Sequence, residues 1–486
     1  MRLSQGLKKL ITATFFLTTL TSYVFSAPTQ LIIRKVPVEI NGKTADLYRI
    51  EQPDGTWGFS GTEGQIFDAE VKNETDSPTI IHWHGLLVPN SQDGVPYVTQ
   101  PPIMSGKSYH YRFKLKQSGT YWMHSHLGLQ VQQLLSAPFI IKASNEPTTD
   151  KDIVMFLSDF SFKSPESILA QLKKGTNLKP MTGNENNLTV THKQMNMTMS
   201  PADKSQPDIN DVNYDAFLTN YKTLQKPDII FIKPGQTARL RIIAGAAMTN
   251  FVVKLGALQG KLIAVDGQNI KPIFNNQFQI AVGQRLDILI RIPPGQGSYP
   301  ILAQGEGTAM QTGLILATEK AKIIFPPEKV KTSEKAFDYT QEVQLKSLKP
   351  LKKEVPGQIL TVSLDGNMMQ YIWQINNQAW PKVTPLTVKS NKRVEMIFIN
   401  RTDMAHPMHL HGHFFEVTEI DGHVIKDGAL HDTILVLPHS TVKVQFDTNN
   451  PGNWVMHCHM AYHQESGMMT FIHYEGTNIP DLSKAK

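Results

Sequence analysis

Short apolar runs separated by turn-forming residues dominate the hydrophobic pattern of this chain. Runs rich in Val, Ile, Thr and Phe occupy residues 237–243, 278–282 and 393–399, and clusters of Gly, Pro, Asn and Asp lie between them. β-Branched and aromatic residues in runs this short are typical of strands. The one helix that we expect is short, over residues 164–174. The pattern therefore predicts a fold made mainly of β-sheet.

The length of the chain, 486 residues, is enough for about three domains at roughly 150 residues each. A polar break follows residue 145, and a later stretch rich in Lys, Glu and Pro has the composition of a linker. We expect a first domain over 27–145, a second over 150–320, a linker over 321–356 and a third over 357–486. Residues 161–226 are polar and poor in clear strands, which indicates a long surface excursion.

The first 26 residues have the pattern of a cleavable secretory signal. Three basic residues precede an apolar run over 10–20, and small or permissive residues come before Ala27. Threonines interrupt the run, which is shorter than the roughly 20 apolar residues that a membrane span requires. We therefore expect a bacterial protein exported to the periplasm or secreted, with no membrane span.

Charge and cysteine content narrow the possible partners. Removing the leader takes three of the 48 basic residues, which leaves 45 Lys and Arg against 42 Asp and Glu, a net charge of +3. This balance gives no reason to expect a nucleic-acid partner. The single cysteine excludes an internal disulfide, although an exported chain could form one, so the thiol is available for a metal.

That cysteine, Cys458, lies between His457 and His459 and is followed by His463 and Met468. Side chains alternate in a strand, so Cys458 points to one face and its two neighbours point to the other. A thiolate, two imidazoles and a weak thioether are the ligands of an electron-transfer blue-copper centre. His463 and Met468 supply two of these groups, and the flanking histidines must then serve a different metal.

The remaining motif histidines occur in pairs two residues apart, which places each pair on one face of a strand. The four pairs are His82 and His84, His124 and His126, His409 and His411, and His457 and His459. His406 precedes the third pair. A single pair is more often a satisfied or surface feature than a metal site. Four pairs, one of which encloses the only cysteine, indicate a cluster of metal ligands. The second domain contains no such motif, so we expect it to act as a scaffold.

These motifs resemble those of the multicopper oxidases, the family of laccases, cuprous oxidases and ascorbate oxidases. The stretches IHWHGLLVPNSQDGVP, GTYWMHSHLGLQ, MNMTMSPAD, AAMTNF, VDGQNIKP and HPMHLHGH look most like the bacterial copper-resistance oxidases. The resemblance covers nearly the whole chain after the leader. It implies an all-β fold of three cupredoxin-like Greek-key β-barrels, and an oxidoreductase that transfers electrons from a reductant to O2.

The resemblance also implies four bound copper ions. Type 1 copper would be held by His406, Cys458, His463 and axial Met468. His82 and His409 match the type 2 ligands. The type 3 pair would be held by His84, His124, His126, His411, His457 and His459. The cluster formed by types 2 and 3 would lie between the first and third domains, since each contributes four histidines.

Proton delivery to that cluster needs an acidic group. Asp93 falls at the family's position for such a carboxylate, although Gln92-Asp93-Gly94 also has the composition of a simple turn. Several bacterial relatives place Glu directly after the type 1 histidine, where this chain has Gln464. An amide cannot donate a carboxyl proton, which leaves the adjacent Glu465 as a second candidate.

The methionines bear on the identity of the reductant, because soft thioethers select Cu(I). Met195, Met197 and Met199 form a compact cluster in a polar stretch, and Met404 lies two residues before His406. Most of the 19 methionines are expected to fill the core. These four are candidate ligands for substrate copper, although the long Met-rich repeats of resistance oxidases are missing.

Three functions remain open from the sequence. The first is a cuprous oxidase in copper tolerance that also oxidises phenols. The second is a laccase or ferroxidase with an organic or ferrous substrate, and the third is a copper-binding or nitrite-reducing cupredoxin without oxidase activity. Nitrite reductases lack the set of eight histidines, which disfavours the third. The expected partners are O2, a small reductant such as Cu(I), Fe(II) or a phenol, and periplasmic copper-handling proteins.

Overall fold

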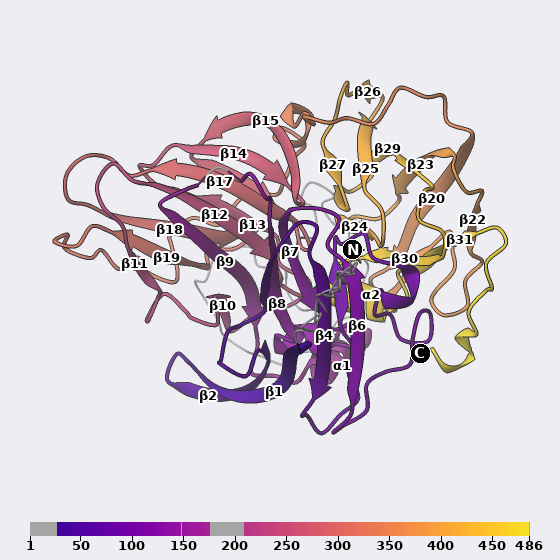
Figure 1. The fold of residues 1–486 in the computed structure, drawn as a ribbon, viewed down its shortest axis with the longest axis horizontal. Coiled ribbons are helices and arrows are strands. Elements are labelled where there is room, and N and C mark those ends of the chain that lie inside the picture. The colour runs from indigo at the N-terminus through magenta and orange to yellow at the C-terminus, as the bar shows by residue number, and fades with distance from the viewer. Residues whose placement is uncertain (1–26, 147, 175–208, 486) are drawn as a thin grey trace, which may run out of the picture.

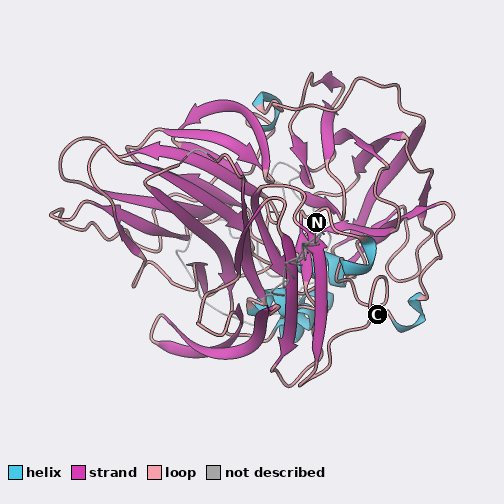
Figure 2. Cartoon of the chain, viewed as in Figure 1, coloured by secondary structure: helices cyan, strands magenta, loops and turns pink. Residues whose placement is uncertain are grey.

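The computed structural model describes residues 27–146, 148–174 and 209–485. Strands are the main secondary structure of this part of the chain, as Figure 2 shows. Its two α-helices are short, α1 over Pro165–Lys173 and α2 over Ala461–Glu465. Four 3-10 helices are η1 (Asn90–Gln92), η2 (Gln130–Gln133), η3 (Glu342–Gln344) and η4 (Leu482–Lys484). The prediction of an all-β fold is confirmed.

The strands form three pairs of sheets, and the first pair is built from the N-terminal third of the chain. One sheet has the order β2 (Lys43–Glu51), β1 (Thr29–Ile40), β4 (Ile66–Asn73) and β6 (Ser108–Lys114). The other has the order β3 (Phe59–Thr62), β8 (Ser136–Lys142), β7 (Gly119–His124) and β5 (His82–His84). His82 and His84 therefore lie on an edge strand of the second sheet, and His124 ends the strand beside it.

The second pair of sheets contains the predicted strands at 237–243 and 278–282, the latter only in part. Its six-stranded sheet runs β10 (Ala216–Thr219), β9 (Lys151–Phe160), β12 (Thr237–Ala244), β17 (Arg285–Arg291), β14 (Gly260–Val265) and β15 (Gln268–Asn275). Its five-stranded sheet runs β11 (Ile229–Phe231), β19 (Gln311–Ala317), β18 (Ser298–Gly305), β13 (Phe251–Lys254) and β16 (Gln277–Ile280). In Figure 1 these sheets lie to the left.

The third pair of sheets follows a stretch without a named strand, from the end of β19 to β20. One sheet runs β21 (Ile372–Ile375), β20 (Gln358–Asn367), β23 (Arg393–Asn400), β29 (Thr441–Asp447), β25 (Phe415–Ile420) and β26 (His423–Val424), with β27 (Leu430–His431) beside β25. The other runs β22 (Leu386–Val388), β31 (Met469–Tyr474), β30 (Asn453–Cys458), β24 (His406–Leu410) and β28 (Thr433–Val436). The predicted strand at 393–399 is β23.

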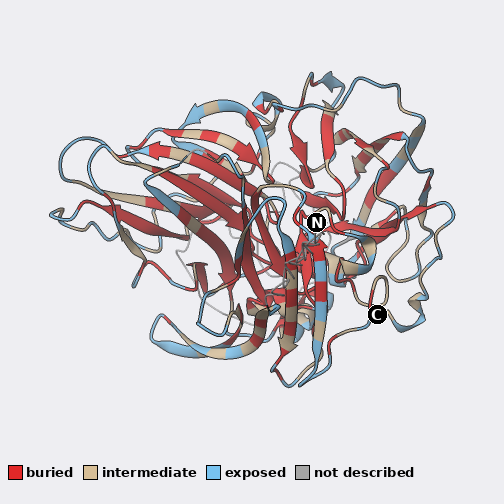
Figure 3. Ribbon diagram, in the orientation of Figure 1, coloured by how far each residue is buried: buried red, intermediate tan, exposed pale blue. Residues whose placement is uncertain are grey.

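Burial follows the period of two that a sheet imposes. Along β29, buried and partly exposed residues alternate, and Figure 3 shows buried segments concentrated where the sheets face one another. The strands that carry the histidines are different: every residue of β5, β7, β24 and β30 is buried. These strands are covered on both faces, which requires that the sheet pairs pack against one another there.

The expected short helix is confirmed as α1, which begins after Ser164. The Ser164 side chain accepts a hydrogen bond from the Ser167 N–H, and Pro165 occupies the first turn. Other expectations fall outside the described residues, namely the leader over 1–26 and the methionines Met195, Met197 and Met199. Among the residues described, no helix has the length and apolar character needed to cross a bilayer.

Candidate metal centre

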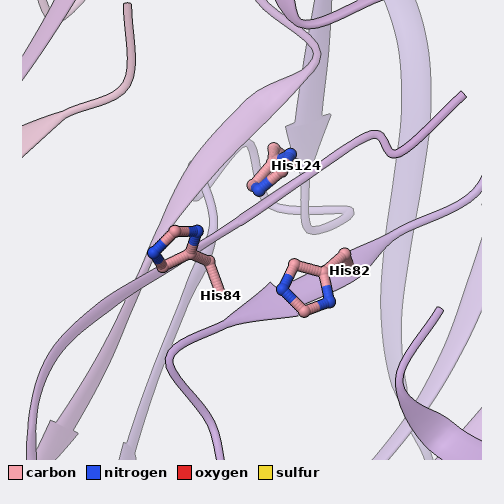
Figure 4. Close-up of side chains that lie close together, drawn as sticks. All are labelled: His82, His84 and His124. Carbon is pink, nitrogen blue, oxygen red and sulfur yellow. The ribbon is translucent and has the colours of Figure 1, made fainter. Parts of the chain in front are cut away.

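Eight buried histidines converge from four strands of the first and third sheet pairs. His82 and His84 lie on β5, and His82 is paired in register with His124 of β7. In the third sheet pair, His409 of β24 is paired with His457 of β30. His126, His411 and His459 lie just beyond the ends of these strands. Figure 4 shows the rings of His82, His84 and His124 close together.

The ring nitrogens of this histidine cluster approach one another across the two domains. His457 Nε2 lies 3.2 Å from His126 Nε2 and 3.1 Å from His411 Nε2. On the other side, His459 Nε2 lies 3.2 Å from His84 Nδ1. Two imidazoles that bind one metal ion at about 2 Å bring their nitrogens to about this separation. The pairing therefore fits shared metal ions.

Other ring nitrogens are fixed by carbonyl groups. His82 Nδ1 lies 2.9 Å from the Asp93 carbonyl, His124 Nδ1 2.9 Å from Ser125, His457 Nδ1 2.9 Å from Cys458, and His409 Nδ1 2.8 Å from Asp432. An Nδ1–H that donates to a carbonyl leaves Nε2 deprotonated and free to bind a metal. Within the described residues, the Nε2 atoms of His82, His124 and His409 have no hydrogen-bond partner. Buried polar atoms are normally satisfied, so these nitrogens fit metal ions.

The protonation of the cluster favours the same interpretation. Burial lowers the pKa well below its usual value for six histidines, and positive charge on neighbouring rings lowers it further. They are His84, His124, His126, His411, His457 and His459. Neutral imidazole is the form of histidine that binds a metal.

Asp93 contacts this cluster directly. Its Oδ2 lies 2.9 Å from His411 Nδ1 and its Oδ1 lies 3.2 Å from His82 Nδ1, and the side chain is buried. Asp93 is also the residue that ends η1, with its N–H bonded to the Asn90 carbonyl. The sequence left open whether Asp93 is a turn residue or a carboxylate at the cluster. In the structure it is both.

A second, mononuclear site surrounds the single cysteine. Cys458 Sγ lies 3.7 Å from His406 Nδ1 and 3.7 Å from His463 Nδ1, and these two nitrogens are 3.2 Å apart. Met468 is fully buried, and its carbonyl accepts a 3.0 Å hydrogen bond from the Cys458 N–H. Burial raises the pKa of the Cys458 thiol well above its usual range, so a thiolate here needs a cation beside it.

The outer atoms of the mononuclear site have partners that sequence reasoning missed. His463 Nε2 lies 3.1 Å from Asp211 Oδ2, which also accepts a 2.6 Å hydrogen bond from the Tyr371 hydroxyl. Trp373 packs on the His463 ring with centroids 4.1 Å apart. Asp211 lies in the polar stretch at 161–226 and belongs to no motif, so its proximity to His463 had no signal in the sequence.

Two further expectations concern residues near these sites. Met404 is fully buried in the hydrophobic core, in the loop that leads to His406. Glu465 is exposed on α2, and its charged neighbours are Lys173 and Glu166 of α1. The position of Glu465 gives no support to a role in proton delivery, because it faces α1 and solvent.

The mononuclear site and the histidine cluster are joined through β30. Cys458 is paired with Met408, and its neighbours His457 and His459 both contact the cluster. A path through a few covalent bonds therefore runs from the cysteine sulfur to each side of the cluster. This arrangement can pass single electrons from one metal site to the other.

Comparison with known protein families gives three matches. Models described as multicopper oxidase match residues 59–146, 151–321 and 353–475. Among curated proteins, the chain is 30% identical over 417 residues to "Multicopper oxidase MmcO" of Mycobacterium tuberculosis, covering 85% of this chain and 80% of that protein. It is 27% identical to "Copper resistance protein A" of Escherichia coli, covering 85% and 87%.

Solved structures show the same fold. The structure of Fet3p, titled a multicopper oxidase that functions in iron import, aligns with a TM-score of 0.75 and 18% identity, covering 92% of this chain and 90% of that one. A laccase from Botrytis aclada aligns with a TM-score of 0.72 and 22% identity, covering 91% and 86%.

Proposed function

The chain belongs to the multicopper oxidase family, and we propose that it oxidises cuprous ion one electron at a time and reduces O2 to water, as part of copper tolerance. One observation carries this proposal: Cys458 of the mononuclear site is flanked by two histidines of the cluster. Export to the periplasm through the predicted leader, and oxidation of phenols as a side activity, are parts of the same proposal.

The ligand assignment follows the contacts of each ring. We assign His406, Cys458, His463 and Met468 to type 1 copper, and His82 and His409 to type 2 copper. The type 3 pair takes His126, His411 and His457 on one side and His84, His124 and His459 on the other. When bound, the four ions would supply one-electron steps and a site at which O2 accepts four electrons. Backbone carbonyls and buried carboxylates of this chain fix the rings, and burial keeps their ligand nitrogens deprotonated.

Asp93 is the residue that we assign to proton delivery. Its Oδ2 is engaged by His411 Nδ1, whereas Oδ1 lies 3.2 Å from His82 Nδ1 but makes no hydrogen bond within the described residues, because His82 Nδ1 bonds to the Asp93 carbonyl instead. Oδ1 is therefore the atom that can hold a proton beside the cluster. A general acid must lie within hydrogen-bond reach of the group that it protonates, and this carboxylate is held at the cluster's edge by two of the histidines.

The surroundings of His463 support a cationic reductant. Asp211 lies against the outer nitrogen of this ring, and its Oδ1 has no hydrogen-bond partner in the described part of the chain. A carboxylate beside the point of electron entry favours a metal cation over a neutral phenol. The copper-resistance relative makes Cu(I) the first candidate. Buried Met404 would have to move before its thioether could bind substrate.

Fe(II) is the second candidate, because the Asp211 carboxylate would attract either cation. Steady-state kinetics with Cu(I), Fe(II) and a phenol on one preparation separates these substrates. A higher kcat/KM for Cu(I) than for Fe(II) supports the cuprous oxidase, and the reverse order identifies a ferroxidase. Preference for the phenol over both metal ions would identify a laccase.

The variant Asp211→Asn tests the contribution of the carboxylate. We expect kcat/KM for the preferred metal ion to fall about tenfold, equivalent to ~1.4 kcal/mol, while phenol oxidation changes less. Asp215→Asn is the matched control, because Asp215 lies in the same segment but bonds to Ser161 and Phe162 at the surface. Equal loss of metal-ion and phenol oxidation would remove the argument for a cationic reductant.

A further inference from the structure

One arginine of the middle domain reaches the histidine cluster. Arg285 is the first residue of β17, and it is fully buried. Its Nε donates a 3.1 Å hydrogen bond to the Thr120 carbonyl of β7 in the first sheet pair. Its two terminal nitrogens donate to Asp432, between β27 and β28 of the third. A single side chain therefore connects all three pairs of sheets.

Asp432 in turn contacts one cluster histidine from each domain. Its Oδ1 lies 3.1 Å from His84 Nε2, and its carbonyl lies 2.8 Å from His409 Nδ1. Because His84 Nδ1 faces His459, the Nε2–H of His84 donates to the carboxylate. A carboxylate that accepts from the outer N–H of a ligand histidine fixes both the tautomer and the orientation of the ring.

The carboxylate of Asp432 also lies near enough to His84 and His409 to be a metal ligand itself. Its hydrogen bonds argue against this role. Arg285 donates to Oδ1 at 2.8 Å and to Oδ2 at 2.5 Å, so both oxygens are engaged by the guanidinium. This bidentate geometry is specific to arginine and sets the plane of the carboxylate. Asp432 therefore orients the ligand rings.

The backbone around this ion pair leaves no room for it to shift. Gly85, directly after His84, has φ +83°, and a Cβ there would lie 2.5 Å from the Arg285 guanidinium and 2.6 Å from Asp432 Oδ2. The Asp266 carboxylate accepts a 3.0 Å hydrogen bond from the backbone N–H of Arg285, and its Oδ1 lies 3.4 Å from the guanidinium nitrogen Nη1. The guanidinium is thus held in place by packing and by a second buried acid.

We propose that Arg285 is a positioning residue of the copper cluster, contributed by the middle domain. It holds Asp432 by both oxygens and so sets the orientation of His84 and His409. The sequence alone assigned only a scaffold role to the middle domain. This inference rests on the proposed ligand assignment, because it concerns how two of those ligands are oriented.

The test is Arg285→Lys in the copper-loaded protein. Lysine keeps the charge but cannot hold both carboxylate oxygens in one plane. We expect the blue absorption to stay, the electron paramagnetic resonance signal of type 2 copper to change or disappear, and the rate of O2 reduction to fall at least about tenfold. KM for the reductant should stay the same, since the mononuclear site does not contact Arg285 in the described structure.

Arg241→Lys is the matched control. Arg241 is also a buried arginine of the middle domain, and it donates to Thr120 Oγ1, but its ion pairs are with Asp152, Glu146 and Asp287. A wild-type type 2 signal and copper content in Arg285→Lys would overturn the proposal. An equal change in both lysine variants would also overturn it, because the effect would then come from the domain interface in general.

A second variant keeps the proposal testable if Arg285→Lys does not fold. Asp432→Asn leaves the arginine in place and removes the carboxylate whose Oδ1 lies 3.1 Å from His84 Nε2 and 3.5 Å from Nδ1 of the type 2 ligand His409. The same change in the type 2 signal is therefore expected, with the blue absorption intact. A wild-type signal in this variant would refute the role of Asp432. Failure of the proposed ligand assignment looks different, because the wild-type protein would then lack the type 2 signal.

Discussion

The mononuclear site and the histidine cluster are neighbours, but they are assembled in different ways. The contacts among His406, Cys458 and His463 come from β24, β30 and α2, all within the third domain. The cluster takes half of its histidines from β5, β7 and the loop that follows β7, far away in the sequence. The mononuclear site therefore depends on local folding of one domain, whereas the cluster also depends on how the domains dock.

The two sites also differ in their outer contacts. Trp373 packs on His463 at the mononuclear site, where Asp211 is the one carboxylate that contacts a ligand ring among the described residues. The cluster has two buried carboxylates, Asp93 and Asp432, and the latter is paired with Arg285. An electron-transfer site functions in a mostly apolar setting, whereas O2 reduction needs protons and compensating charge. The charged groups lie around the cluster, the site that we propose for O2 reduction.

The largest effect should come from removing the thiol. In Cys458→Ser the mononuclear site loses the sulfur that defines a blue-copper centre, so the blue absorption and the oxidase activity should both be abolished. The eight histidines of the cluster are untouched, and copper at the other sites should stay near normal. Absorption spectra, copper content and O2 consumption on one preparation measure all three quantities.

Met456→Leu is a suitable control, because Met456 is buried on the same strand and the substitution preserves its volume. It should stay blue and active. A blue, active serine variant would show that Cys458 is not the ligand. Loss of copper from all sites would show that the mononuclear site and the cluster do not assemble independently. That outcome would contradict the proposal that one depends on the folding of a single domain and the other on domain docking.

The parts of these sites that follow from local spacing could be predicted from the sequence. Two histidines at i and i+2 share a face of a strand whatever the fold, so the spacing alone identifies the pair on β5 and the pair that begins at His409 near the end of β24. The strands themselves follow from short β-branched runs. The resemblance to a known family then supplied the pairing of distant motifs, which spacing alone does not give.

Sequence reasoning missed Asp432, Arg285 and Asp211 because these residues reach the sites only through tertiary contacts. Asp432 lies 147 positions from Arg285 in the sequence, and Asp211 lies 252 positions from His463. An isolated Asp or Arg has no periodic pattern, and its partner is fixed by the docking of sheets whose register cannot be read from one chain. Asp93 was found because it falls at the position of a carboxylate in the family that the chain resembles, although its contact with His411 also crosses the domains.

Asp93→Asn should have the opposite effect to the cysteine variant, because it should impair the cluster and leave the mononuclear site intact. The amide keeps the shape of the side chain but cannot hold the proton that O2 reduction consumes, so turnover should fall about 100-fold. Reduction of type 1 copper under anaerobic conditions should continue at the wild-type rate. Stopped-flow measurement of the two half-reactions separates them.

Asp46→Asn is the control for this variant, and at an exposed position on β2 it should change neither rate. Equal slowing of both half-reactions would place Asp93 outside the proton path, and wild-type turnover would leave it only its role in the turn.

The smallest expected effect is on the docking of the domains. The histidine cluster depends on this docking, whereas the mononuclear site does not. His431 is buried between Asp266 of the second sheet pair, 2.8 Å from its Nδ1, and Glu342 of the connecting stretch, 3.2 Å from its Nε2. Burial disfavours a charged imidazole, but the two carboxylates outweigh it and raise the pKa of His431 to about 10. The charged ring therefore stabilises the docked domains.

Because the folded pKa of His431 lies above the unfolded value of about 6.5, its stabilisation is complete below pH 6.5 and is lost as the pH rises through about 10. His431→Gln should lower the free energy of unfolding by about 3–5 kcal/mol at pH 6, since it leaves two buried acids without their partner. The difference from wild type should shrink as the pH approaches 10. Denaturant unfolding at pH 6, 8 and 10 measures this difference.

His439→Gln, at an exposed ion pair with Asp403, should change stability little at any pH. A constant difference for His431→Gln across this range would mean that the ring is neutral in the folded protein and contributes by packing alone.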